Sequence, residues 1–216
     1  MIKAVLFDLD GTLLDRDSSL KQFVMNQHDR LEVLHSADKA EYTARFIELD
    51  SKGYVWKDKV YLSLIKEYKI SGITADELLT DYIMNFRYHC TPFPNLKELL
   101  ELITSREIRL AMITNGFGDF QLGNVDALGI SHYFEFIMVS ELEGLRKPDE
   151  EIFRRALERL GVNASESIYV GDHPVNDVEA SKRVGMKGIW KSDSYYEDKF
   201  DRDGVIHDLL DLKNYL

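Results

Sequence analysis

The chain has little cysteine, no long hydrophobic run and no apolar leader, and each absence excludes a class of protein. Its single cysteine, Cys90, excludes an internal disulfide framework, so nothing indicates an oxidising compartment. No segment approaches the ~18 consecutive apolar residues of a membrane-spanning helix. Charged residues at Lys3, Asp8 and Asp10 interrupt the apolar stretch that a secretory signal needs. The sequence therefore predicts a cytoplasmic protein without a membrane partner.

Positive charge is also scarce. Lysine and arginine total 27 against 38 aspartate and glutamate residues, which gives a formal net charge of -11. A chain this acidic is a poor general binder of nucleic acid polymers and anionic membranes. Apolar residues make up 44% of the 216 residues and charged residues 30%, which is typical of a globular protein. At roughly 150 residues per domain, this length predicts one domain, or one domain with a large insertion.

Five short apolar segments have the pattern of strands that are buried on both faces. They lie at residues 2–9, 108–113, 136–139, 168–170 and 187–190. Apolar residues at helical spacing lie between them, as at Leu96, Leu99, Leu100 and Ile103, and again from Ile152 to Leu160. Strands that alternate with helices in this way predict an α/β fold with a doubly wound parallel sheet.

Residues 15–91 break this alternation, because they contain no convincing strand. Four apolar stripes at helical spacing take its place, at residues 20–34, 42–49, 60–68 and 78–86. Thr74, followed by Glu77, predicts a capping box at the start of the fourth helix. Pro92 and Pro94 lie too close together to continue a helix. We therefore expect a core of residues 1–14 and 92–216, interrupted by an all-helical domain of residues 15–91.

Polar side chains follow the expected strands, where the ligands of an open parallel sheet bind. They are Asp8 and Asp10 after the first strand, Thr114 and Asn115 after the second, Lys147 after the third, and Asp172 and Asp177 after the fourth. Four carboxylates and one ammonium carry a net charge of -3. Two like charges ~4 Å apart repel by roughly 4 kcal/mol at an effective dielectric of 20. Since Mg²⁺ prefers carboxylate oxygens, we expect a magnesium site here, without which an anionic substrate would be repelled.

These residues resemble the four motifs of the haloacid dehalogenase-like (HAD) superfamily. Asp8-Leu9-Asp10-Gly11-Thr12 is similar to motif I, Thr114 to motif II, Lys147 to motif III, and Gly171-Asp172 with Asp177 to motif IV. Their order and spacing fit over essentially the whole chain. The helical insertion resembles the helical cap of the first type. The resemblance implies a Rossmann-like core with an inserted cap.

The resemblance also implies a role for each of these side chains. Asp8 would attack phosphorus and form an aspartyl-phosphate, and Asp10 would act as general acid and then as general base. Thr114, Asn115 and Lys147 would bind the phosphoryl oxygens. The implied Mg²⁺ ligands are Asp8, Asp10 through its main-chain carbonyl, Asp172 and Asp177. Dehalogenases of the superfamily lack an acid at the position of Asp10, because a leaving halide needs no proton.

We therefore expect a Mg²⁺-dependent phosphatase that hydrolyses a small soluble phosphomonoester. Nucleoside monophosphates, sugar phosphates and phosphoglycolate all remain open as substrates, and a capped enzyme of this size can work as a monomer. One alternative is an intramolecular phosphomutase of the β-phosphoglucomutase type, which would return the phosphoryl group to a sugar. Another is a non-catalytic phospho-acceptor that resembles response-regulator receivers, although these are shorter and lack a cap.

Ordinary structural roles are open for some of these residues. Pro148 after Lys147 fits the first position of a helix, and Asp177 fits a helix N-cap. His173 lies within the fourth motif, where the resemblance gives it no fixed role.

Overall fold

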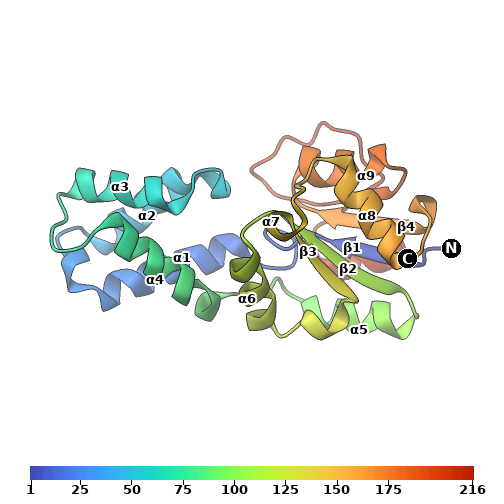
Figure 1. Ribbon diagram of the computed structural model, residues 1–216, viewed down its shortest axis with the longest axis horizontal. Coiled ribbons are helices and arrows are strands. Elements are labelled where there is room, and N and C mark those ends of the chain that lie inside the picture. Colours follow the sequence, from blue (N-terminus) through green and yellow to red (C-terminus); the bar gives the residue numbers. More distant parts are fainter. The chain divides into compact units, whose positions relative to one another are not determined.

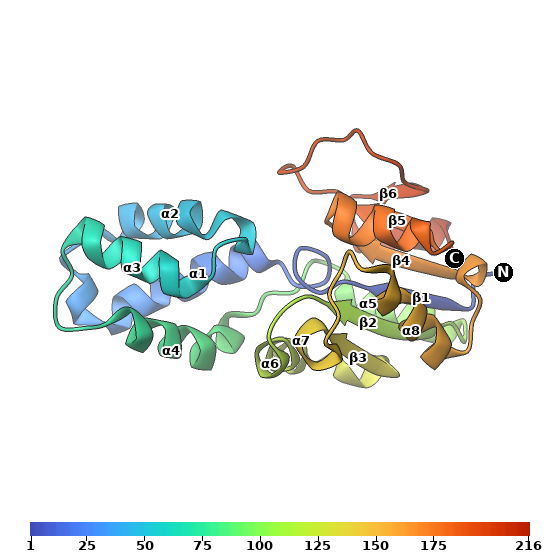
Figure 2. The same cartoon turned by 45° about the horizontal axis from the view of Figure 1, so that its top comes forward.

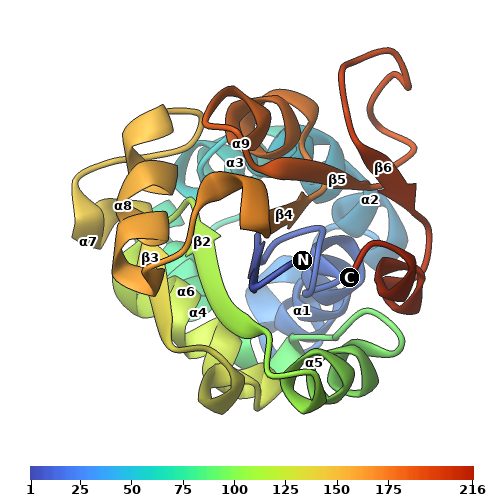
Figure 3. The same cartoon turned by 90° about the vertical axis from the view of Figure 1, so that its right-hand side faces the viewer.

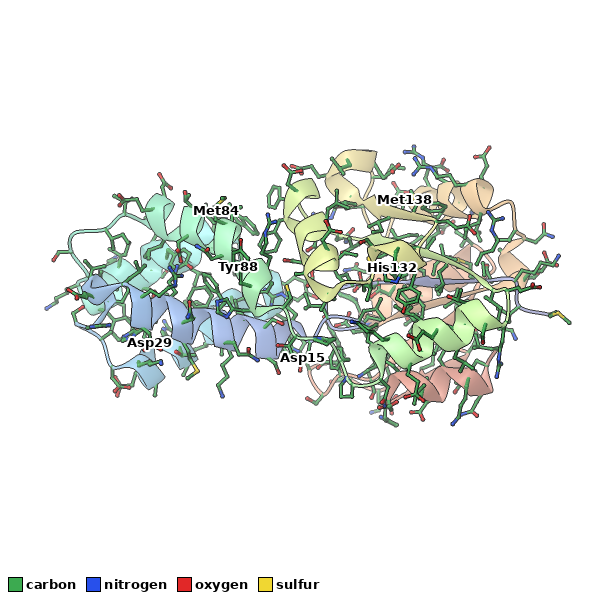
Figure 4. The ribbon with its side chains drawn as sticks, turned by 90° about the horizontal axis from the view of Figure 1, so that it is seen from below. Asp15, Asp29, Met84, Tyr88, His132 and Met138 are labelled. Atoms are coloured by element: carbon green, nitrogen blue, oxygen red, sulfur yellow. The ribbon has the colours of Figure 1, made fainter.

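The computed structural model describes residues 1–216 and divides into two compact units. We call Met1–Asp15 together with Pro92–Leu216 the core unit, and Arg16–Thr91 the helical unit. The chain passes from the first unit to the second at Asp15, which Figure 4 labels. No helix in either unit is both long enough and apolar enough to cross a bilayer.

The core unit contains a six-stranded sheet in which every neighbouring pair is parallel. Its strands are β1 (Ala4–Phe7), β2 (Arg109–Thr114), β3 (Phe136–Val139), β4 (Ser167–Gly171), β5 (Lys187–Lys191) and β6 (Gly204–Ile206). Their spatial order is β3-β2-β1-β4-β5-β6, which Figure 2 shows from the edge at β3 to the edge at β6. The predicted α/β fold with a parallel sheet is confirmed.

Five of the six strands coincide with the short apolar segments. β1 begins two residues later than expected and ends two residues earlier, because Asp8 and Leu9 already belong to the turn after the strand. β6 was not expected. It is three residues long, with only Ile206 buried, and it forms by pairing with the end of β5 (Trp190 with Val205). So short a strand has no periodicity of its own.

Helices cover both faces of the sheet (Figures 1 and 3). On one face lie α8 (Glu150–Leu160) and α9 (Ala180–Arg183), and on the other lies α5 (Leu96–Ser105). The apolar stripe of α8 packs against alternate residues of the strands, among them Leu6 of β1 and Ile113 of β2. Because successive strand residues face opposite sides, both faces of the central strands are buried.

Shorter elements complete the core unit. These are α6 (Gly118–Leu128), α7 (Ser140–Glu143), the π-helix η6 (Pro174–Glu179) and the 3₁₀ turns Ser131–Tyr133, Ala164–Glu166 and Leu209–Asn214. The structural alternative in which Pro148 starts a helix is excluded, because α8 begins at Glu150 with Asp149 as its N-cap. The Asp149 side chain accepts a hydrogen bond from the Glu151 N–H, which satisfies a donor at the helix end.

The helical unit contains no strand. Its helices are α1 (Arg16–Arg30), α2 (Lys39–Asp50), α3 (Lys57–Tyr68) and α4 (Ala75–Asn85), with 3₁₀ turns at Glu32–Leu34, Ser51–Gly53 and Phe86–His89. The capping box before α4 is present: the Glu77 N–H donates to Thr74 Oγ1 and the Thr74 N–H donates to Glu77 Oε2. The first apolar stripe is longer than its helix, because α1 ends at Arg30. Met84 near the end of α4 and Tyr88 in the turn that follows are both exposed (Figure 4).

Candidate active site

The site lies where the strand connections change direction. From β1 the chain proceeds to β2 and β3 on one side of the sheet, whereas β4, β5 and β6 lie on the other side. Phe7, the last residue of β1, pairs with Met112 of β2 and with Val170 of β4. The residues that follow these three strands therefore meet at one edge, at the topological switch point of the sheet.

Three carboxylates meet at this edge. The side chains of Asp8, Asp172 and Asp177 each offer one oxygen, and these three oxygens lie within 4.8 Å of one another. A Cβ atom at Gly171 would collide with the Asp177 carboxylate, so the absence of a side chain there allows the close approach. Hard divalent cations such as Mg²⁺ prefer oxygen ligands of this kind, so the donor set fits a magnesium ion.

Lys147 provides the positive charge within this cluster. Its Nζ lies 2.5 Å from Asp8 Oδ1 and 2.6 Å from Asp177 Oδ1, and the side chain is 3% exposed. A third contact joins Nζ to the hydroxyl of Tyr169 at 3.0 Å. That hydroxyl donates in turn to the main-chain oxygen of Ile113 at 2.9 Å. All three hydrogens of the ammonium thus have partners, and its position is tightly held.

The balance of charge shifts the pKa values of these groups. Burial raises the pKa of Asp8 to about 7, which the attraction of Lys147 only partly opposes and the repulsion of Asp177 reinforces. Burial, Asp177 and Asp8 raise the pKa of Asp172 well above its usual value. For Lys147, burial alone would lower the pKa, but Asp177 and Asp8 outweigh it and hold the pKa well above normal. One ammonium is too little positive charge for three clustered carboxylates, and a bound dication would supply the remainder.

Asp177 lies inside η6, which excludes the structural alternative that it is a helix N-cap. The N-cap is His173, whose Nδ1 accepts hydrogen bonds from the main-chain N–H groups of Val175 and Asn176 at 3.1 Å each. The His173 main-chain N–H donates to Asp177 Oδ2 at 3.0 Å. His173 therefore orders the helix start and holds the Asp177 carboxylate, with its Nδ1 engaged in capping.

Thr114 and Asn115, the two residues expected to bind phosphate after β2, face different partners. Thr114 is buried, and its hydroxyl accepts a hydrogen bond from Gln121 Nε2 at 2.8 Å. The side-chain amide of Asn115 pairs with the main chain of Lys147: Nδ2 donates to the oxygen and Oδ1 accepts from the N–H, both at 2.9 Å. Asn115 thus fixes the loop that carries Lys147. The Asp10 carboxylate is separate from the three-carboxylate cluster, and its Oδ2 accepts from Gln121 Nε2 at 2.8 Å.

Two residues of the site, Tyr169 and Gln121, were not expected from the sequence. Tyr169 lies in the apolar segment 168–170 and has the pattern of a core residue, although its side chain ends in a hydroxyl. Gln121 lies on α6, which has no clear apolar stripe that would have marked it as a helix. The available signal for Gln121 was a long polar side chain close in sequence to Thr114, near enough to contact the loop after β2.

Comparison with known proteins adds the family. Residues 5–191 match the model of the haloacid dehalogenase-like hydrolases, a span that includes all seven expected site residues. The chain belongs to the haloacid dehalogenase-like hydrolase family. The chain is 31% identical to the glyceraldehyde 3-phosphate phosphatase of Pyrococcus abyssi over 207 residues, which cover 88% of this chain and 81% of that protein.

Solved structures of this family carry different activities in their names. A crystal structure of a HAD phosphatase from Thermococcus onnurineus is 25% identical with a TM-score of 0.70, and the match covers 99% of this chain and 97% of that chain. A crystal structure of a 2-haloacid dehalogenase from Pseudomonas syringae is 26% identical with a TM-score of 0.62, again over 99% and 97%. Because both activities occur on this fold, the choice between them depends on the side chains at the site.

Proposed function

We propose that this protein is a Mg²⁺-dependent phosphatase that hydrolyses a small phosphomonoester through an aspartyl-phosphate on Asp8. The observation that carries the proposal is the position of Asp8, whose carboxylate contacts Lys147 at 2.5 Å within a cluster of acidic ligands, with Asp10 two residues further on. A carboxylate is a known nucleophile for phosphoryl transfer. Asp10 supports phosphate chemistry over dehalogenation, because an alkoxide leaving group needs a proton and a halide does not.

In the proposed reaction, a carboxylate oxygen of Asp8 forms a bond to phosphorus as the bond between phosphorus and the ester oxygen breaks. Asp10 gives its proton to the leaving oxygen, and afterwards accepts a proton from the water that hydrolyses the acyl phosphate. Lys147 and Thr114 stabilise the negative charge on the phosphoryl oxygens. Asn115 contributes through its main-chain N–H, since its side chain is engaged with the main chain of Lys147.

Asp8, Asp172 and Asp177, with the main-chain oxygen of Asp10, would hold the Mg²⁺, which when bound offsets the charge of the carboxylates and of the phosphoryl group. Lys147 also contacts two of these carboxylates, Asp8 and Asp177, so its ammonium would neutralise part of the same negative charge.

The proposed substrates are small alkyl phosphates. Relatives of this chain are named glyceraldehyde 3-phosphate phosphatase, phosphoserine phosphatase and phosphoglycolate phosphatase, with identities of 31%, 27% and 28%. All three names contain a short phosphorylated compound with a carbonyl or carboxyl group. These names support hydrolysis over mutation of a sugar phosphate, because hydrolysis is the activity they share.

A screen of these three esters for phosphate release, with Mg²⁺ and with EDTA, tests the proposal. We expect Mg²⁺-dependent release of phosphate, and transfer to a second hydroxyl without release would indicate the mutase instead. Asp10→Asn should lower turnover of the best substrate by ~10²-fold to ~10⁴-fold, the usual contribution of a general acid–base group. Mg²⁺ binding by this variant, measured by calorimetry, should stay nearly intact. Wild-type turnover in Asp10→Asn would refute the acid–base role.

A further inference from the structure

The side-chain amide of Gln121 joins the proposed acid to the phosphate-binding loop. Its Nε2 lies 2.8 Å from Asp10 Oδ2, 2.8 Å from Thr114 Oγ1 and 3.2 Å from the main-chain oxygen of Asn115. The Gln121 side chain is 2% exposed, and its contact with Thr114 is fully buried. This buried amide donates hydrogen bonds to two proposed functional residues, Asp10 and Thr114, so its role extends beyond the packing of α6.

The orientation of this amide is determined by its surroundings. The three atoms near Nε2 are a carboxylate oxygen, a hydroxyl oxygen and a carbonyl oxygen, all able to accept. On the other side, Gln121 Oε1 accepts a hydrogen bond from Asn124 Nδ2 at 3.2 Å. If the amide were rotated by half a turn, Gln121 Oε1 would face the Asp10 carboxylate, and Gln121 Nε2 would face the donor Nδ2 of Asn124. The N–H groups of Gln121 therefore face Asp10.

The loop after β2 is shaped around this side chain. Gly116 has a φ of +155°, in the region that favours glycine. A Cβ atom at this position would lie 2.7 Å from Gln121 Cγ and 3.0 Å from Cδ, too close for any real side chain. A larger residue at Gly116 would push the amide away from Asp10. The backbone conformation thus accommodates the reach of Gln121 into the site.

We propose that Gln121 is a positioning residue that orients Asp10 for proton transfer to the leaving group, an inference that rests on the proposed phosphatase activity. The Gln121 amide donates to Oδ2 of Asp10, so this oxygen acts as an acceptor and the transferable proton resides on Oδ1. No protein group donates to Oδ1, which is thus available to the ester oxygen. As the bond from phosphorus to the ester oxygen breaks, its electron pair stays on that oxygen, which takes the proton from Oδ1. The bond from Asp8 to phosphorus forms in the same step.

This role predicts an effect that depends on the leaving group. An alkyl ester needs the proton from Asp10, because an alkoxide is a poor leaving group, whereas nitrophenolate leaves without one. A misplaced acid therefore slows the alkyl ester selectively. Loss of packing, or of the contact with Thr114, would slow both esters by a common factor, since both share one phosphoryl group. The quantity to compare is kcat/KM, which covers the steps through release of the alcohol and excludes hydrolysis of the aspartyl-phosphate.

The test compares Gln121→Met with wild type on p-nitrophenyl phosphate and on an alkyl ester. The alkyl ester is whichever of glyceraldehyde 3-phosphate, phosphoserine and phosphoglycolate the wild type hydrolyses fastest. We expect Gln121→Met to lower kcat/KM for the alkyl ester by ~10-fold to ~100-fold, which is less than the complete loss of a general acid would cause. For p-nitrophenyl phosphate, kcat/KM should fall by less than ~3-fold, because this leaving group needs no proton. Asp10→Asn calibrates the largest selective loss. Gln121→Glu, which keeps the shape of the side chain and replaces its donor, should lose the alkyl ester selectively as well, and it serves as the second variant if Gln121→Met does not fold.

Gln27→Met is the matched control. Gln27 is a fully buried glutamine of the helical unit whose Nε2 donates to Asp81 Oδ2 at 2.9 Å. It should lose stability without changing the ratio of the two kcat/KM values. An equal loss on both esters in both Gln121 variants, while Asp10→Asn discriminates, would overturn the positioning role and leave the phosphatase proposal standing. If wild type releases phosphate from no ester, the proposed function fails and this inference fails with it.

Discussion

Each unit buries a cluster of charged side chains, and the two clusters have opposite balances. In the core unit three carboxylates share one ammonium, that of Lys147. In the helical unit a single carboxylate, Asp50, meets two cations: it pairs with Arg16 at 2.9 Å and with the buried ammonium of Lys57. Asp50 also accepts a hydrogen bond from the Gly53 N–H at 2.9 Å.

The same burial has opposite results in the two places. It raises the pKa of Asp8 to about 7, because Lys147 alone cannot offset burial and the neighbouring carboxylates. Burial would raise the pKa of Asp50 as well, but Arg16 and Lys57 outweigh it and hold the pKa below its usual value. A buried acid that is fully compensated stabilises its fold, whereas an undercompensated acidic cluster marks a site that requires a cation.

The largest expected effect is on activity. Asp8→Asn removes the proposed nucleophile, so phosphate release in Mg²⁺ should fall by ~10⁴-fold or more. Yet the core unit should remain folded, because Lys147 keeps its pairing with Asp177. Initial rates on the best ester, with circular dichroism as the folding control, measure both. Residual turnover within tenfold of wild type would exclude Asp8 as the nucleophile.

The next largest effect is on the stability of the helical unit. Asp50→Asn leaves the buried ammonium of Lys57 and the half-buried guanidinium of Arg16 without their carboxylate, which should cost about 3–5 kcal/mol in the free energy of unfolding. The chain has two tryptophans, Trp56 in the helical unit and Trp190 in the core unit, so a Trp190→Phe background reports the helical unit alone during urea unfolding. Asp29→Asn is the control.

Asp29 (Figure 4) pairs with Lys39 at 2.6 Å, but its side chain is 60% exposed. Water screens such a pair, so this variant should unfold at nearly the same urea concentration as its parent. Equal losses of unfolding free energy in Asp50→Asn and Asp29→Asn would mean that the buried cluster stabilises the helical unit no more than an exposed ion pair does.

Addition of Mg²⁺ should stabilise the core unit and leave the stability of the helical unit unchanged. At ~100 times its dissociation constant, the ion should stabilise the core unit by about 3 kcal/mol. In a Trp56→Phe background, fluorescence of Trp190 reports this unit, since its Nε1 donates to the main-chain oxygen of Asp172 at 2.7 Å. The helical unit, read from Trp56, should show no such gain. A gain of equal size in both units would argue against the carboxylate cluster as the binding site.

The smallest expected effect is the pH dependence of the metal-free protein. The pKa of Asp8 is about 7 in the folded core unit and ~3.9 unfolded, so the folded state binds more protons between these values. Stability of the core unit in EDTA should therefore fall by about 1 kcal/mol or more as the pH rises from ~5 to ~8. Asp8→Asn should reduce this slope. Stability that rises over the same interval would contradict the raised pKa.

The compensated cluster should respond in the opposite sense. Because the folded pKa of Asp50 lies below its unfolded value, its contribution to the helical unit is complete above pH ~4 and is lost on further acidification. Denaturation of the helical unit between pH ~5 and ~8 should accordingly show no loss that is due to Asp50.

Local patterns in the sequence were sufficient for most of the elements. The apolar run of β1, the helical stripe of α8 and the capping box at Thr74 each depend on residues within one segment. β6 and α6 were not predicted, because neither is marked by a local pattern in the sequence. β6 forms by pairing with β5. α6 buries polar residues such as Gln121 and Asn124, so its buried face has no apolar stripe that the sequence would show.

By itself, the sequence determined which residue types follow each strand, and hence that acids, a hydroxyl and a lysine are available at one edge of the sheet. Only the tertiary structure decided which of them touch. Lys147 lies between Asp8 and Asp177, Asn115 is engaged with the main chain of Lys147, and Gln121 reaches Asp10. The reason is physical: spacing along a chain encodes burial and backbone conformation, whereas contacts between distant residues depend on strand order and register.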